Sequence, residues 1–522
     1  MSLFDKFYPM YYRSFEDRDS TKHLLDFYYS TDIDHLIAEY RTYNSVLLKE
    51  KAKSLYLDFF HFIAERVPAY KDFLRLNGVD HTKIVSSDDM QRVPWVNKKN
   101  YLGKYAPNEL CVDGSLRSNG LVALSSGSSG QPFSWPRGGF QDVESNLTAE
   151  VFLKDIFEID KYKTLVINCF SMGMYVAGLH VTNMVIQASY KGYDLLVATP
   201  GLSLSDIDKV LREASGPYDQ IILAGYPPFV KDVVDYSIAH GFSWSKRKLR
   251  FLFAAEGFSE KWRENIITSA SQDFSDLSIS LNMYGSADSL ILGHETPISI
   301  CAKRILESND QVSTAVIGST RTCTLIQYNP LMRFFEKENN ELIFSSFAGI
   351  PLVRYNIHDE GGLFTHNELY SQFLKIGVDL HNELRNNNIN NSWKLPFLYL
   401  FGKSDSTISY YGLKIFPENI KAALESDQLK QWATGKFRMQ VKDDNNGIQK
   451  IIIAIELGFA LEPSVELVTI FSRELVVTLR QKNSEYNRLY ESLGEKSLPL
   501  VKLFPKGSGL FSNDVVKQKC VM

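Results

Sequence analysis

Six consecutive small residues form the first segment of the sequence that could bind an anion: Ser125, Ser126, Gly127, Ser128, Ser129 and Gly130. Glycines let a ligand approach the backbone closely, and successive N–H groups with serine hydroxyls can surround phosphate oxygens. No Lys-Ser or Lys-Thr pair follows, so the segment is not a P-loop. The same composition is typical of a flexible linker. The apolar residues 121–124 before it favour a structured loop, and the linker stays open as the alternative.

A second candidate is the segment 282–288, where an aromatic ring, a glycine and a carboxylate follow one another. Tyr284 could cover a purine ring, and Gly285 with Ser286 would form the turn that follows. Asp288 could then bind a metal ion such as Mg²⁺. The alternative is a strand end with a solvated aspartate.

The third candidate is the segment 351–362, in which charged residues stand beside two glycines. A carboxylate at a strand end, here Asp359, is suited to bind two ribose hydroxyls. Arg354 could bind a phosphate or carboxylate through two parallel hydrogen bonds. An ion-paired β-turn is the alternative, and His358 alone is more typical of a turn than of a catalytic base.

The elements that must position these residues alternate between strands and helices. Apolar runs at 164–170, 193–200, 220–227 and 249–257 predict buried strands, and the segments 204–214 and 228–241 predict helices between them. This alternation predicts a mostly parallel α/β architecture. Residues 20–75 predict helices, the later segments around 320–364 predict hairpins with a turn at 338–340, and 464–482 predicts a long helix. The Asn-rich stretch 385–394 predicts an exposed loop or linker.

The composition is that of a soluble globular protein, with 44% hydrophobic and 23% charged residues among 522. This length predicts more than one domain. A net charge of −4 argues against nucleic acid as a partner. The five cysteines lack disulfide or zinc spacing. No apolar run has the ~20 residues of a membrane span, and the N-terminus lacks a signal-peptide core. A cytoplasmic protein without membrane contact is therefore expected.

Taken in order, the motifs resemble those of the adenylate-forming enzyme superfamily, which includes acyl-CoA synthetases, luciferases and nonribosomal adenylation domains. The resemblance extends from about residue 58 to the C-terminus, and the branch most resembled is the phenylacetate–coenzyme A ligase type. Residues 125–131 resemble the family's phosphate loop, and 254–263 its Gly-Glu-Pro segment. Residues 351–362 resemble its Arg-Tyr-x-x-Gly-Asp motif, and 401–420 resemble its hinge.

The resemblance implies that ATP is bound by residues from several of these segments. Ala255, Glu256 and Gly257 would lie near the adenine, and Tyr284 would cover it. Asp359 would bind the ribose hydroxyls.

The resemblance also implies a magnesium site and a hinge, with departures from the family pattern. Asp288 stands where the family has a magnesium-binding glutamate. Lys403 stands where the hinge motif has an arginine, and Asp405 would be the pivot. Gln131 replaces the lysine that usually follows the phosphate loop, and His358 replaces a glycine.

The largest departure lies at the C-terminus, where the family has a lysine that reaches the acyl phosphate. Leu510 occupies that position in this sequence. Lys506, Lys517 and Lys519 are the candidates to replace it, and the sequence does not choose among them. The same basic residues are also typical of a solvated tail.

The implied fold is α/β, with a large N-terminal domain of mixed and parallel sheets with helices over 1–401, of which 1–80 is mostly helical. A small α+β domain over 402–522 would be joined to it by the hinge. The acyl pocket is expected to include Phe170, Met172, Met174, Tyr175 and His180, for each of which core packing is the alternative.

The implied function is activation of an aryl or medium-sized carboxylic acid to an acyl-adenylate, followed by transfer to the thiol of coenzyme A or of a phosphopantetheine carrier protein. A rival hypothesis is a degenerate member that binds nucleotide or acyl-adenylate without turnover and acts as a partner or sensor. The absent terminal lysine favours the rival, and the retained Tyr284 and Asp359 oppose it. The sequence leaves the oligomeric state open, and a homodimer is one option.

Overall fold

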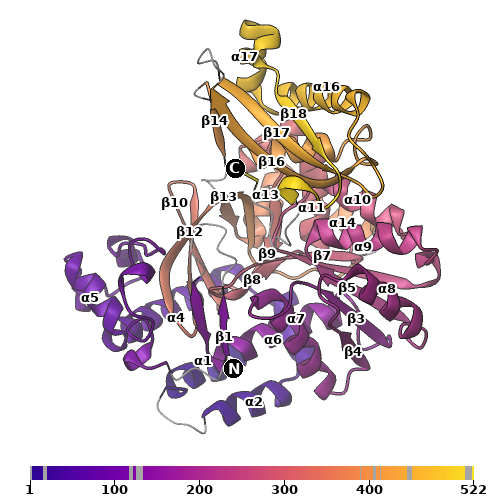
Figure 1. Cartoon of the computed structure of the whole chain (residues 1–522). Helices are drawn as coiled ribbons and strands as arrows, with labels where there is room; N and C mark the ends of the chain where they lie inside the picture. The colour runs from indigo at the N-terminus through magenta and orange to yellow at the C-terminus, as the bar shows by residue number, and fades with distance from the viewer. Residues whose placement is uncertain are drawn as a thin grey trace.

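The computed structural model describes residues 3–15, 20–116, 121–124, 133–387, 389–403, 407–411, 413–443, 449–511 and 520–521 (Figure 1). Several predicted functional positions lie outside these ranges: residues 125–130, Asp405, Lys517 and Lys519.

The N-terminal part of the chain is helical, as predicted. The helices are α1 (Leu3–Arg13), α2 (Ser20–Ser30), α3 (Ile33–Thr42), α4 (Ser45–Arg66) and α5 (Pro68–Leu76). Asp32 and Asn44 cap α3 and α4, because each side chain accepts hydrogen bonds from two backbone N–H groups of the first turn. Aromatic side chains join these helices to the rest of the chain, with the ring centroids of Phe7 and Phe140 lying 4.2 Å apart.

An 11-stranded mixed sheet forms the centre of the molecule, in the order β10-β11-β12-β13-β9-β8-β7-β6-β5-β3-β4. The strands are β3 (Thr164–Cys169), β4 (Leu195–Ala198), β5 (Gln220–Gly225), β6 (Lys248–Ala254), β7 (Ser280–Ser286), β8 (Leu290–His294), β9 (Thr324–Gln327), β10 (Arg333–Glu338), β11 (Glu341–Ser346), β12 (Leu352–Phe364) and β13 (Phe397–Lys403). Strands β3 to β7 pair in parallel, and the others pair antiparallel. The predicted α/β fold class is thereby confirmed.

Helices cover both faces of the parallel strands: α6 (Gly139–Asp155), α7 (Val176–Tyr190), α8 (Leu204–Glu213), α9 (Pro227–Ala239) and α10 (Glu260–Ser269). Successive side chains of a strand point to opposite faces, so the strand residues divide between two buried clusters. Val166 packs in the same cluster as α7, whereas Leu165 and Ile167 pack with α8 and α9. The remaining helices before residue 400 are α11 (Pro297–Ser308), α12 (Asp310–Ile317), α13 (His366–Lys375) and α14 (Leu380–Asn386).

The connections around β3 create a crevice at one edge of the sheet. Strand β3 lies between β4 and β5, and the helix that follows β3 covers one face while the helix that follows β5 covers the other. In open α/β sheets, ligands bind outside the carboxyl ends of the strands at such a reversal of strand order. The fold therefore marks the carboxyl ends of β3 and β5 as the place for a site.

The residues after 407 have a hydrophobic cluster of their own, which contains Tyr410, Phe437 and Leu475. The elements are β14 (Ile408–Tyr410), β15 (Leu413–Ile415), α15 (Pro417–Leu424), β16 (Ala433–Asp443), β17 (Gln449–Leu457), α16 (Val465–Lys482), α17 (Ser484–Leu493) and β18 (Leu500–Phe504). Figure 1 shows this part, coloured orange to yellow, above the carboxyl edge of the large sheet. The division into domains at Gly402 remains a prediction.

Several local predictions can be compared directly with the structure. The turn predicted at 338–340 is confirmed between β10 and β11: its two central residues, Asn339 and Asn340, both have positive φ, as a two-residue turn requires. The predicted hairpin within 351–364 is wrong, because these residues form the single strand β12. The Asn-rich segment is not an exposed linker throughout: Trp393 is buried, and its indole N–H donates to Asp155 at 2.7 Å.

The two strands that flank the predicted phosphate loop are β1 (Leu121–Leu124) and β2 (Ser134–Arg137), which pair antiparallel. Within the described residues, no helix is both long and apolar enough to cross a membrane.

Candidate active site

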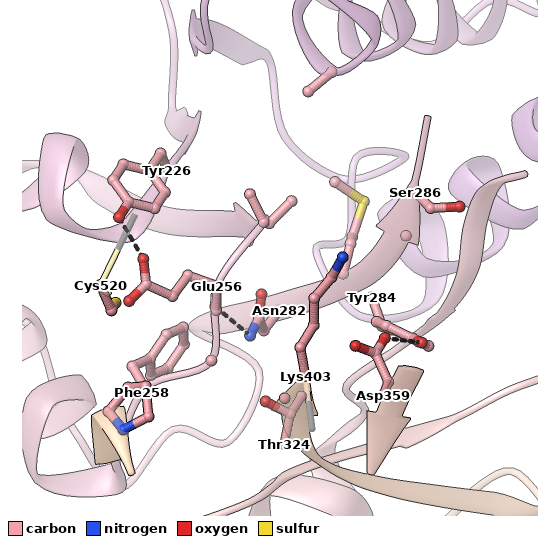
Figure 2. A pocket seen from close by; sticks show the side chains of 18 of the residues that line it. Tyr226, Glu256, Phe258, Asn282, Tyr284, Ser286, Thr324, Asp359, Lys403 and Cys520 are labelled. Carbon is pink, nitrogen blue, oxygen red and sulfur yellow. Dashed lines mark hydrogen bonds between the residues drawn. The ribbon is translucent and has the colours of Figure 1, made fainter. Parts of the chain in front are cut away.

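A cavity of about 1170 Å³ lies at the carboxyl ends of β3, β5, β6 and β7 (Figure 2). Residues after the ends of these strands line it, among them Phe170, Tyr226 and Glu256. Residues of the C-terminal part, such as Lys421 and Lys506, complete its wall. The cavity thus occupies the crevice that the strand order creates, with the C-terminal part above it.

Most of the described candidate residues line this one cavity. They are Phe170, Tyr175, His180, Ala255, Glu256, Gly257, Tyr284, Gly285, Ser286, Asp288, Asp359, Lys403 and Lys506. They come from segments separated by more than 300 residues in the sequence. Leu124, the last described residue before the predicted phosphate loop, also lines the cavity.

Tyr284 and Asp359 form a hydrogen-bonded pair at the end of β7 and in β12. The Tyr284 hydroxyl donates to a carboxylate oxygen of Asp359 at 2.6 Å, as Figure 2 shows. Burial and the neighbouring Asp359 carboxylate raise the pKa of Tyr284 well above its usual value. The phenol therefore stays protonated and holds the Asp359 carboxylate in place.

Lys403 lies directly opposite Asp359 in the β12–β13 pairing. Its side chain extends into the cavity, as Figure 2 shows. A cation and a carboxylate therefore enter the same space from neighbouring strands, so the site offers partners to both an anionic and a hydroxyl-bearing part of a ligand.

Asp288 is a buried carboxylate at the wall of the cavity. Burial raises its pKa, and Lys98, a hydrogen bond from Tyr355, and Lys403 oppose that rise. Across the described ranges, no group of three His, Cys, Asp or Glu side chains is placed to bind a metal ion. A divalent cation at Asp288 would therefore need most of its ligands from a bound substrate.

The loop after β6 places a backbone turn at Ala255 and the carboxylate of Glu256 at the cavity. Ala255 has a φ of 80°, in the left-handed region that side chains rarely adopt. The Glu256 carboxylate accepts a hydrogen bond from Tyr226 and pairs with Lys421 of the C-terminal part. The Asn282 amide donates to the Glu256 carbonyl at 3.1 Å. These contacts fix the loop, and a side chain at Gly257 would meet the Thr324 hydroxyl at 2.6 Å.

The C-terminal part contributes Lys506 to the cavity, where its amino group lies 2.6 Å from Asp232 of α9. Asp232 is buried, and burial raises its pKa, while Lys506 and Lys436 oppose the rise. Lys436 is 3.7 Å from the same carboxylate. Leu510, which stands where the resemblance implied a lysine, is 44% exposed and is not among the residues that line the cavity.

Three of the predicted site residues, Met172, Met174 and Arg354, do not line the cavity. Met174 is 53% exposed and does not line it. The Arg354 guanidinium is buried and pairs with Glu336 at 3.1 Å and with Glu338 at 2.8 Å, while donating to the carbonyls of Met90 and Val93. These contacts join Arg354 to β10 and to the segment 90–93, so in this structure its guanidinium is occupied by protein groups.

Several lining residues were not predicted from the sequence: Lys98, Tyr226, Asp232, Arg321, Lys421 and Lys436. Tyr226 could have been found, because it ends a predicted strand at the edge where parallel strands place their ligands. The lysines lie on surface elements whose packing over the cavity depends on tertiary structure, and no local pattern distinguishes them.

Comparison with known proteins supports the fold alone, because the similar structures share only 13–14% sequence identity with this chain. No protein-family model matches the sequence, and no curated protein matches it. The structure resembles crystal structures of a 2-hydroxyisobutyryl-CoA ligase. The postadenylation state with R3-HIB-AMP gives a TM-score of 0.59 at 13% identity, covering 91% of this chain and 89% of the other. The same state with 2-HIB-AMP gives 0.58 at 14% identity, covering 90% and 88%. The thioesterification state with 2-HIB-AMP and CoA gives 0.51 at 13%, covering 93% and 91%. The chain therefore has the fold of this CoA ligase.

Proposed function

We propose that this protein uses ATP to convert a carboxylic acid into an acyl-adenylate and then transfers the acyl group to a thiol. The observation that carries the proposal is the convergence of Tyr284, Asp288, Asp359 and Lys403 on one cavity at the carboxyl edge of the sheet. A fold shared with a CoA ligase supports it. The motif order favours the phenylacetate–coenzyme A ligase type of branch. The aromatic and methionine residues expected at the acyl pocket favour an aryl or medium-sized acid, and the composition of the sequence favours activity in the cytoplasm.

In the first step, a carboxylate oxygen of the acid attacks the α-phosphorus of ATP, and the bond from that phosphorus to the pyrophosphate oxygen breaks. The nucleophile is already an anion, so no general base is needed. Negative charge builds on the phosphate oxygens, and cations fixed in advance lower the barrier. Lys403 and Lys506 are the lining residues we assign to that task. Asp359, held by Tyr284, accepts the ribose hydroxyls.

A magnesium ion fits this site if the nucleotide supplies most of its ligands. Asp288 is one buried carboxylate, and burial raises its pKa more than the nearby lysines and the hydrogen bond from Tyr355 lower it, so a bound cation would favour its charged form. Mg²⁺ is commonly bound by one or two carboxylates together with substrate phosphates. Asp288 would hold the ion, which would neutralise charge on the phosphates.

In the second step, a thiolate attacks the acyl carbon, and AMP leaves with the oxygen it gained from the acid. The thiol belongs to coenzyme A or to a carrier protein's phosphopantetheine. We assign Asp405 as the pivot about which residues 402–522 rotate to admit it. Rotation would separate Glu256 from Lys421 and Lys506 from Asp232, pairs that now join the two parts.

The test is acid-dependent exchange of label between pyrophosphate and ATP, with magnesium present and thiol absent, across aryl and medium-chain acids. Exchange with at least one acid supports adenylation and names the substrate class. ATP binding by calorimetry without exchange for any acid would instead favour the binding-only hypothesis. Adding coenzyme A or a phosphopantetheinylated carrier then identifies the acceptor.

A further inference from the structure

His180 is a buried side chain whose two ring nitrogens have no hydrogen-bond partner among the described residues, yet it lines the cavity. It lies on α7, and Ala177 and Val181 on the same helical face also line the cavity. Only 5% of the residue is exposed. Buried polar atoms are nearly always paired, so an unpaired imidazole at a ligand cavity calls for a partner from outside the protein.

The imidazole of His180 is neutral at physiological pH. Burial, with a smaller contribution from the Arg137 guanidinium, lowers its pKa to about 3. A neutral imidazole has one N–H donor and one acceptor nitrogen. A second carboxylate on the substrate would need a cation beside it, and Arg137 is not among the residues that line the cavity. The partner that fits is a neutral group that can donate or accept.

Apolar side chains line the same cavity as His180. Phe170, Val181, Met283 and Ile291 belong to one hydrophobic cluster and also line the cavity. Such walls bind a hydrocarbon skeleton, and within them a single polar atom sets a strong preference. A site built to bond a hydroxyl rejects the analogue that lacks it, because the protein's polar atom is then left unpaired.

Resting on the function proposed above, we propose that His180 selects carboxylic acids that carry a neutral hydrogen-bonding substituent, a hydroxyl group above all, on the acyl portion. Plain hydrocarbon acids and dicarboxylates are the disfavoured classes. A water molecule bound to His180 is the rival account, and in that case the substituent on the acid would not matter.

The experiment compares matched acids in the pyrophosphate exchange assay. The pairs are benzoate against its monohydroxy isomers, phenylacetate against the hydroxyphenylacetates, and hexanoate against the hydroxyhexanoates. In the wild-type protein, kcat/KM for at least one hydroxylated acid should exceed that for its parent by about tenfold or more. His180→Leu should abolish that preference, and His180→Gln, which keeps a donor and an acceptor, should retain part of it.

Two controls separate specificity from folding and from cavity shape. His180→Leu removes two unpaired buried nitrogens, so its melting temperature should not fall. Phe170→Leu changes the same cavity without changing its polarity, so it should alter both members of a pair alike.

Equal use of hydroxylated and parent acids by the wild type would overturn the inference, and so would a preference that survives His180→Leu. Both results leave adenylation itself intact. Absence of exchange with every acid is a different result: it refutes the proposed function and removes the premise of this inference with it.

Discussion

Replacing Asp359 with alanine should weaken ATP binding more than any other single change in the nucleotide region. In the proposed complex the carboxylate accepts hydrogen bonds from two ribose hydroxyls. A hydrogen bond to a charged group contributes about 1.5–3 kcal/mol net of exchange with water, and two bonds to one carboxylate do not add in full. We expect a net loss of about 2–3 kcal/mol, which corresponds to roughly 30- to 150-fold in the dissociation constant. Calorimetric titration with ATP and magnesium, without acid, measures it directly.

Tyr284→Phe is the matched control, because it removes only the hydroxyl that donates to Asp359 at 2.6 Å. The ring that would cover the adenine remains, so the loss should be about tenfold or less. The melting temperature of both variants should first be shown to match that of the wild type, so that a loss of affinity does not reflect a loss of folding. Unchanged ATP affinity in Asp359→Ala would refute the ribose assignment. Equal losses in the two variants would show that the Tyr284–Asp359 bond, and not contact with the ribose, accounts for the effect.

The other predictions concern the C-terminal part. Lys506→Ala should slow exchange by about 10²- to 10³-fold and Lys436→Ala by far less, since only the first is assigned to the phosphates; equal slowing would refute that assignment. Asp405→Pro should leave exchange intact and block thioester formation, and equal loss of both steps would argue against a pivot there. Burial raises the pKa of Glu425, which accepts a hydrogen bond from Ser259, to about 7 from a usual 4.5. The protonated Glu425 carboxyl therefore stabilises the folded state in full below about pH 4.5, and this contribution to the unfolding free energy is lost as the pH rises through about 7. Glu425→Gln should flatten the fall in unfolding free energy over that range by up to about 1.4 kcal/mol per pH unit, and an unchanged slope in chemical unfolding would contradict this.

The fold was largely predictable because its central strands are buried on both faces. Such strands are continuous apolar runs, and those at 220–227 and 249–257 correspond to β5 and β6 within a few residues. Helix ends were also predictable where a local signal exists: Ser203 caps α8 at its first turn. The strand β12 was missed as a single element because His358 has a positive φ of 64° and two glycines follow, a pattern that also fits a turn.

The sequence placed Asp359 and Tyr284 at the cavity correctly, whereas Arg354, predicted for the same site, does not line it. Asp359 and Tyr284 stand in ordered motifs, and both line the cavity. Arg354 stands in the same motif as Asp359, but Glu336 and Glu338 are close to it only after β10, β11 and β12 pair. Successive residues of a strand point to opposite faces of the sheet, and this can be predicted from the sequence. Which side chains they meet on each face depends on how distant strands pair, and this cannot.

The cluster around Asp232 explains how the protein could work with leucine at position 510. Asp232 is buried and holds Lys506 at 2.6 Å, while Lys436 lies 3.7 Å from the same carboxylate. A buried carboxylate that loses its only cation is strongly destabilised. With two lysines present, ATP phosphates can recruit Lys506 while Lys436 remains to pair with Asp232. Under the proposed function, Lys506, four residues before Leu510, supplies the positive charge that the phosphates require. Removing Lys436 should make it costlier for Lys506 to leave Asp232 for the phosphates, although Lys506 itself is still present.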